Sequence, residues 1–218
     1  MKKTYFTTTS IPADSVGFYH NLYLAQAVDY AVHNSTLEYK LILDSLQNTN
    51  YDEMKFAINS EISNSSDSIR LQFLQENVSP ETFSILINLE NAVENNSENY
   101  NAVSNAVDNL VNEVNFENID TDDAYLIRGY AGTLKSSALF WYPVSLGGSG
   151  RGNDFIRYEE KNSKSSNVQE RRLPPRVRAD GRGFGFGLVW GTLTTANPGT
   201  GVLAGIGGAV GASLMYGR

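Results

Sequence analysis

The 218-residue sequence contains no cysteine, which excludes disulfide bonds, thiol catalysis, cysteine zinc ligands and a lipidated cysteine. Histidine is scarce as well: only His20 and His33 occur, and their separation does not bring them together on a helix. Neither is spaced from an acidic residue in the way that metal ligands are. We therefore expect no catalytic site, no metal and no cofactor. His20 lies beside Tyr19 and Tyr23 on a predicted apolar face, which favours a core histidine.

The amino terminus lacks the apolar run that follows the basic start of a signal peptide. Met1-Lys2-Lys3 is followed by threonines, a serine and the aromatic pair Tyr5-Phe6. Either the chain is not exported by that route, or an initiating Met replaces a leader. The cellular location therefore stays open. The glycine-rich carboxyl-terminal segment leads us to expect membrane association or a place in the cell envelope.

Basic residues are few in the first part of the chain. Residues 1–150 hold 7 Lys/Arg against 19 Asp/Glu, whereas residues 151–218 hold 10 against 5, which gives the net charge of −7. Phosphate contacts need clustered Lys and Arg. The acidic first part therefore argues against nucleic acid as a partner.

Residues 14–142 show the three- and four-residue apolar spacing that is typical of amphipathic helices. The clearest start signal is Ser79-Pro80, a capping serine followed by proline at the first helical position. Asp14-Ser15 and Thr121-Asp122-Asp123 are further expected caps. The pattern predicts an all-α fold built on a small helical bundle. The expected helices begin near Val16, Leu37, Asp52, Pro80, Val103 and Thr121.

Residues 143–180 are predicted to form a polar, basic linker. Pro143 ends the last bundle helix, and Gly147-Gly148-Ser149-Gly150 follows it directly. The stretch 161–167 consists of Lys, Asn and Ser, a composition typical of disorder. We therefore expect this segment to separate the bundle from the end of the chain.

Residues 181–218 form a glycine-rich tail in which Gly183 to Gly217 carries no charged side chain. Its glycines recur every fourth residue, so each set leaves one helix face without side chains, where a second helix can approach closely. The pattern predicts a glycine-zipper helical hairpin that turns at Asn197-Pro198-Gly199. The residues predicted to mediate membrane or self-association are Gly183, Gly187, Gly191, Gly201, Gly205, Gly207, Gly211 and Trp190.

The basic residues before the tail, Arg176, Arg178 and Arg182, are expected at an anionic lipid surface. Each arm has about 14–16 residues, which reaches only about 24 Å at ~1.5 Å per residue, less than a hydrocarbon core of ~30 Å. Two alternatives stay open. The tail packs tightly on the bundle, or it forms a β-like or flexible appendage, since Gly183-Phe184-Gly185-Phe186 alternates like a strand.

Two segments carry a family resemblance. Val16-Gly17-Phe18-Tyr19-His20-Asn21-Leu22-Tyr23-Leu24 resembles the V-G-x-x-H-N-x-x-L opening of small, uncharacterised Bacteroidetes proteins. Those proteins also end in a glycine- and alanine-rich segment after an Ala-Asp pair, here Ala179-Asp180. The family supplies no activity. The resemblance implies that Gly17, His20 and Asn21 do more than fill space.

Together these features predict a non-enzymatic protein whose tail binds membrane lipid or a second copy of the chain. The most specific form of this hypothesis is a bacteriocin-like action. The alternative is a structural or interaction protein whose tail packs on the bundle and whose partner is another protein.

Overall fold

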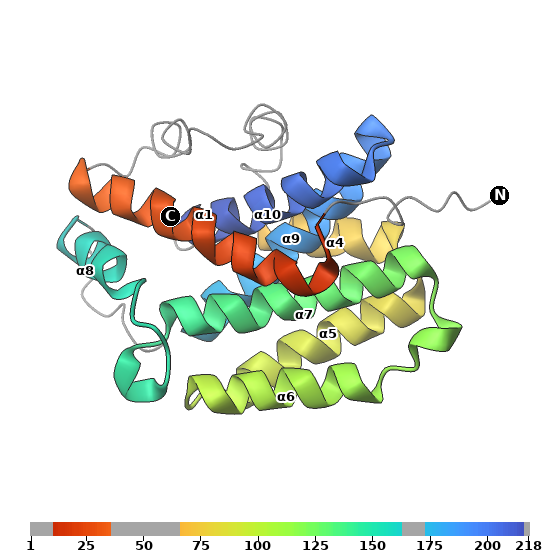
Figure 1. Ribbon diagram of the computed structural model, residues 1–218, viewed down its shortest axis with the longest axis horizontal. Helices are drawn as coiled ribbons and strands as arrows, with labels where there is room; N and C mark the ends of the chain where they lie inside the picture. Colours follow the sequence, from red (N-terminus) through yellow and green to blue (C-terminus); the bar gives the residue numbers. More distant parts are fainter. Residues whose placement is uncertain (1–10, 36–65, 163–172, 216–218) are drawn as a thin grey trace.

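The computed structural model describes residues 11–35, 66–162 and 173–215. These residues form helices and short 3-10 turns without any strand, which confirms the all-α fold (Figure 1). The helices are α1 (Val16–His33), α4 (Asp67–Asn77), α5 (Pro80–Asn95), α6 (Tyr100–Glu113), α7 (Thr121–Trp141), α8 (Asn153–Asn162), α9 (Leu173–Thr195) and α10 (Pro198–Met215). The 3-10 turns are η1 (Ala13–Ser15), η3 (Phe116–Asn118) and η4 (Val144–Leu146).

Local capping chemistry explains several helix starts. The Ser79 hydroxyl accepts a hydrogen bond from the backbone N–H of Thr82, and Pro80 occupies the first turn of α5, as the sequence predicts. Helix α7 is capped by Asp120, one residue before the expected cap, through its bond to the N–H of Asp122. Ser15 makes no such bond, because the turn η1 leads directly into α1.

Helices α7 and α9 lie at the centre of the molecule. Helix α7 packs against α1, α5, α6 and α9, and α9 packs against α4, α5, α7 and α10. Figure 1 shows α5 and α6 on one side of α7, with α1 and the blue pair of α9 and α10 on the other. The end of the chain therefore contributes to the main hydrophobic core, through residues such as Phe184, Ile206 and Leu214.

Two segments differ from their predicted structure. Residues 143–180 were expected to be a polar linker, but they contain η4, α8 and the first turns of α9. Phe155 and Ile156 of α8 are buried in the core, which gives this charged segment an apolar anchor. Helix α4 was not expected; its Phe73 ring packs edge-on against Phe186 of α9. The helices expected near 37–46 and 52–62, and the stretch 163–167, lie outside the described residues.

Candidate functional site

Helices α9 and α10 run antiparallel and touch backbone to backbone. A methyl group built on Gly183 would overlap the carbonyl oxygen of Gly208, and one built on Gly187 would overlap the carbonyl oxygen of Ala204. Glycine is required at both positions, because any side chain there would push the helices apart. The fourfold glycine spacing thus serves a contact within this chain.

Gly191 and Gly201 extend this contact toward the turn, and Gly205 lies within it. A methyl group on Gly191 would lie 2.7 Å from the Ala204 Cβ, and one on Gly205 would lie 2.9 Å from the Phe184 ring. Gly201 faces Leu188 and Thr192 in the same way. Gly207 and Gly211 are buried as well. At the turn, the Asn197 side chain accepts a bond from the N–H of Gly199 and so caps α10.

Helix α9 uses a second set of glycines against α7. A methyl group on Gly181 would lie 2.8 Å from both Leu134 and Tyr130, and one on Gly185 would lie 3.1 Å from the Tyr130 ring. These two residues lie outside the fourfold set that the sequence singled out. Residues Gly183–Gly187 are part of helix α9, so the β-like alternative is wrong. Glycine occupies every second position there because successive glycines face two different helices, α10 and α7.

Gly17 brings α1 onto α7. A methyl group at this position would overlap the carbonyl oxygen of Gly132 and the hydroxyl of Ser136. This contact gives one motif residue a defined role, a close helix crossing. It also sets the position of His20, which lies one turn later on the same buried side of α1.

His20 is fully buried, as its apolar neighbours predict, and it faces Asp180. Its Nε2 atom lies 3.5 Å from Asp180 Oδ2. The same carboxylate oxygen accepts bonds from the hydroxyls of Ser137 at 2.5 Å and Ser213 at 2.6 Å. The Ser213 hydroxyl in turn accepts a bond from the indole N–H of Trp141. We call these five residues the buried polar cluster; they join α1, α7, α9 and α10.

Asn21 holds the other edge of the imidazole. Its side-chain nitrogen donates to the carbonyl of Ser136 at 2.7 Å, so its Oδ1 atom faces His20 Nδ1 at 3.0 Å. A carbonyl oxygen can only accept, so His20 Nδ1 must carry a proton. The His-Asn pair and the Ala-Asp pair of the resemblance thus meet in space, a contact that no sequence spacing could have predicted.

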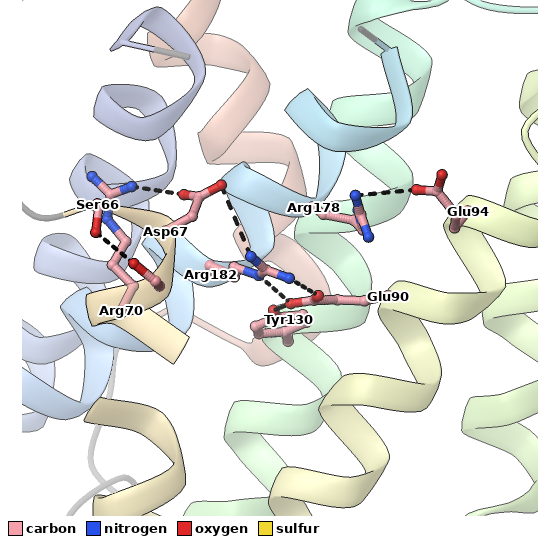
Figure 2. A network of polar contacts seen from close by, with 9 residues as sticks. Ser66, Asp67, Arg70, Glu90, Glu94, Tyr130, Arg178 and Arg182 are labelled. Atoms are coloured by element: carbon pink, nitrogen blue, oxygen red, sulfur yellow. Dashed lines mark hydrogen bonds and ion pairs between the residues drawn. The ribbon is translucent and has the colours of Figure 1, made fainter. Parts of the chain in front are cut away.

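A second set of ionic contacts holds α9 against α5 and α4 (Figure 2). Arg182 donates to the two carboxylate oxygens of Glu90 at 2.8 and 2.5 Å. The Tyr130 hydroxyl donates to Glu90 Oε1 at 2.6 Å, and Arg182 also lies 4.0 Å from Asp67. One turn earlier, Arg178 pairs with Glu94 at 3.2 Å. Glu90 was not singled out from the sequence, because its partners lie far along the chain.

These contacts shift proton affinities in a consistent direction. Hydrogen bonds to Glu90 raise the pKa of Arg182, so this guanidinium stays charged. Burial, reinforced by the Glu90 charge, raises the pKa of Tyr130 well above its usual value. The Tyr130 phenol therefore stays protonated and serves as a donor to Glu90 throughout the physiological range.

The three arginines expected at a lipid surface are placed differently in the structure. Arg176 is buried, with its guanidinium 4.3 Å from the centre of the Trp141 ring. Arg178 and Arg182 point toward α5, where they meet Glu94 and Glu90. The acidic bundle thus pairs with Arg178 and Arg182, and these two arginines hold α9 against α5. Trp190 is partly buried and packs beside Phe186.

Within the described ranges, no helix combines the length and apolarity needed to cross a bilayer. The same ranges contain no cluster of three His, Asp or Glu side chains that could hold a metal ion. Comparisons with protein-family models, curated proteins and solved structures find no match to this chain. The contacts that hold α9 and α10 in the bundle form the candidate site.

Proposed function

We propose that this chain is a non-enzymatic interaction protein in which α9 and α10 form the inner framework of a helical bundle. The contact of Gly183 and Gly187 with the backbone of α10 supports this proposal most directly. In this arrangement the glycine faces are occupied inside one chain. They are not offered to a second copy or to lipid.

We propose further that the acidic outer helices bind a partner protein with a basic surface. No Lys or Arg occurs between Arg70 and Arg128, a stretch that includes all of α5 and α6. Several of its carboxylates are exposed, among them Glu98, Glu113 and Glu117. Such a surface attracts cationic partners in a salt-dependent way.

Exposure of the tail is the first test of this proposal. Hydrogen exchange of the full chain should show slow exchange along α9 and α10, and trypsin should spare Arg176, Arg178 and Arg182. In vesicle flotation, the full chain should stay unbound with both anionic and neutral lipids. Fast exchange in α10 would contradict the inner framework.

The acidic surface has a separate test. Immobilised poly-lysine should retain the chain at low salt and release it at high salt. Replacing Glu98 and Glu113 with Gln should weaken retention. The matched control is the double variant Asp14→Asn with Asp29→Asn, which removes two exposed charges from η1 and α1. This variant should leave retention on poly-lysine largely unchanged. Equal losses in both variants would contradict a defined binding surface.

Membrane or self-association is the second candidate, and α10 favours it, because this helix carries no charged residue. If the pair left the bundle, its apolar and glycine faces would be free for lipid or a second copy, and Arg176, Arg178 and Arg182 could contact anionic lipid. Flotation of the full chain, together with fast exchange in α10, would support this candidate. Leakage of dye from anionic vesicles would extend it to bacteriocin-like action.

A further inference from the structure

We propose that four exposed asparagines along the outer side of α6 bind the backbone of an extended, basic peptide segment of the partner protein. These residues, which we call the asparagine row, are Asn101, Asn105, Asn109 and Asn112. Helix α6 lies at the edge of the bundle in Figure 1. The inference deepens the proposed function and rests on it, because the row belongs to the acidic outer helices where we place the basic partner.

The asparagine row lies opposite the buried face of α6. Val103 and Val107 are the buried residues of this helix. At 3.6 residues per turn, the four asparagines fall within an arc of about 80°, and the centre of that arc points away from the two valines. Asp108 lies beside the row, but Lys135 of α7 holds it in an ion pair at 2.6 Å. The outermost surface of α6 therefore consists of uncharged side-chain amides.

These amides have no structural role that explains them. Two neighbouring asparagines do have one: the Asn99 side chain accepts a bond from the N–H of Ala102 and caps α6, and Asn115 caps η3. Within the part of the chain that the structure describes, the side chains of the row make no hydrogen bond to another protein group. Asparagine is also a weak helix former, because its side chain competes with the backbone. Alanine at these positions would make α6 more stable, so a ligand explains the row better than the fold does.

The spacing of the row matches the repeat of an extended peptide. A side-chain amide is complementary to a peptide group, since each carries a carbonyl acceptor and an N–H donor. Residues four apart on a helix rise by about 6 Å. In an extended chain, the N–H and C=O groups that face one side recur at every second residue, about 6.7 Å apart. From Asn101 to Asn109 the two repeats therefore differ by only about 1.4 Å in total, which side-chain rotation can absorb.

Carboxylates at the two ends of the row favour a basic peptide over other partners. Glu98 precedes the first turn of α6 and Glu113 ends the helix, and both are exposed. Lys or Arg side chains of a bound peptide would pair with these carboxylates. In a two-fold contact between two copies of this chain, the acidic ends of the rows would meet each other. The same charges repel nucleic acid.

Fluorescence anisotropy of the full chain with a labelled peptide tests the row. The probe is a peptide of about ten residues in which Lys and Thr alternate, long enough to span the row when extended. The double variant Asn105→Ala with Asn109→Ala should bind it about tenfold or more weakly, since each lost hydrogen bond costs roughly fivefold. Alanine favours the helix, so this variant keeps its fold. The matched control, Gln26→Ala with Gln75→Ala, removes two exposed amides from α1 and α4 and should bind like the wild type.

A second probe separates backbone recognition from charge. A peptoid of the same length and charge carries its side chains on nitrogen and has no backbone N–H. The wild type should bind this peptoid about tenfold less tightly than the peptide, and the asparagine double variant should bind the two probes alike. Equal affinity of the wild type for peptide and peptoid would show that only charge is recognised and would overturn the row.

The outcomes separate the two proposals. If the peptide binds the wild type and the double variant alike, or binds neither, while poly-lysine retains the chain, the asparagine row is wrong and the acidic surface stands. Dimerisation of the wild type that the double variant loses, measured by sedimentation, would also overturn the row as a peptide site. If neither the peptide nor poly-lysine binds the wild type, the acidic binding surface itself is wrong.

Discussion

Glu90 and Arg182 lie face to face between α5 and α9, 92 positions apart in the chain, joined by two hydrogen bonds of 2.8 and 2.5 Å. Both are largely buried, with 4% of the glutamate and 17% of the arginine side chain exposed. Their burial makes each one dependent on the other, because a single charge left in the interior would keep only a minor contact, Glu90 with the Tyr130 hydroxyl or Arg182 with Asp67 at 4.0 Å.

Replacing only Arg182 with Met should therefore cost about 3–5 kcal/mol of unfolding free energy. The double variant Glu90→Leu with Arg182→Met should recover much of that loss, because it removes both charges. Urea denaturation of the wild type, the two single variants and the double variant forms a double-mutant cycle, which measures the coupling free energy between positions 90 and 182. Asp108→Asn, which breaks the more exposed pair with Lys135, is the control and should cost less than about 1 kcal/mol. Additive losses at positions 90 and 182 would contradict the coupling.

Gly187 tests the backbone contact between α9 and α10. Gly187→Ala should destabilise the protein by about 1–3 kcal/mol, because the new methyl group overlaps the carbonyl of Ala204. Gly132→Ala is the matched control, since a methyl group there would make only ordinary contacts at 3.8 Å. That substitution should be neutral or stabilise by about 0.5–1 kcal/mol, the usual gain of alanine over glycine in a helix. Thermal unfolding of both variants checks the prediction, and equal shifts would count against it.

Tyr142 should make the protein sensitive to alkali. Burial, together with the charges of Glu98 and Glu94, raises the pKa of its phenol to about 12. In the unfolded chain a tyrosine ionises near pH 10, so above that pH the folded state binds more protons than the unfolded state. This contribution to stability is complete below about pH 10 and is lost as pH rises toward 12.

Urea denaturation at several pH values between 9 and 12 measures this slope. Tyr142→Phe should have a shallower slope than the wild type, although it loses the hydrogen bond from the phenol to the carbonyl of Ser97 and is less stable at neutral pH. Tyr158→Phe, a change in a partly buried tyrosine of α8, provides the comparison. Parallel slopes in wild type and Tyr142→Phe would refute the assignment.

Ser79 anchors the start of α5 through its bond to the N–H of Thr82. Ser79→Ala should cost about 1 kcal/mol, whereas Ser79→Gly should cost only a few tenths, because glycine is itself tolerated at a helix cap. Chemical denaturation of the two variants distinguishes a capping role from a side-chain packing role. In the packing case, glycine would cost more than alanine.

The sequence predicts what depends on local chemistry. Ser79-Pro80 identifies the start of α5, and the apolar spacing around Val103 and Val107 identifies α6. The buried position of His20 also follows from its aromatic neighbours. Each of these features is set by residues within one or two turns.

The features that the sequence misses depend on distant partners. Helix α4 has weak amphipathicity of its own and is fixed by Phe186 of α9. The arginines of α9 look like a basic surface until Glu90 and Glu94 are brought beside them. Asp180 stands beside His20 only because α1 and α9 both pack on α7, so a single sequence without coordinates cannot reveal the buried polar cluster.

The central place of α9 also constrains how the chain is made. Its partners α4, α5 and α7 all precede it in the sequence, and α10 follows it. During synthesis, the earlier helices leave the ribosome before the segment that fills the space between them exists. Their apolar faces must wait for α9 and α10, so we expect the packed core to form only after residues 173–215 have left the ribosome. Such distant pairings also slow folding. Until α9 and α10 are in place, a nascent chain of this kind would depend on its acidic exterior, or on a chaperone, to stay dissolved.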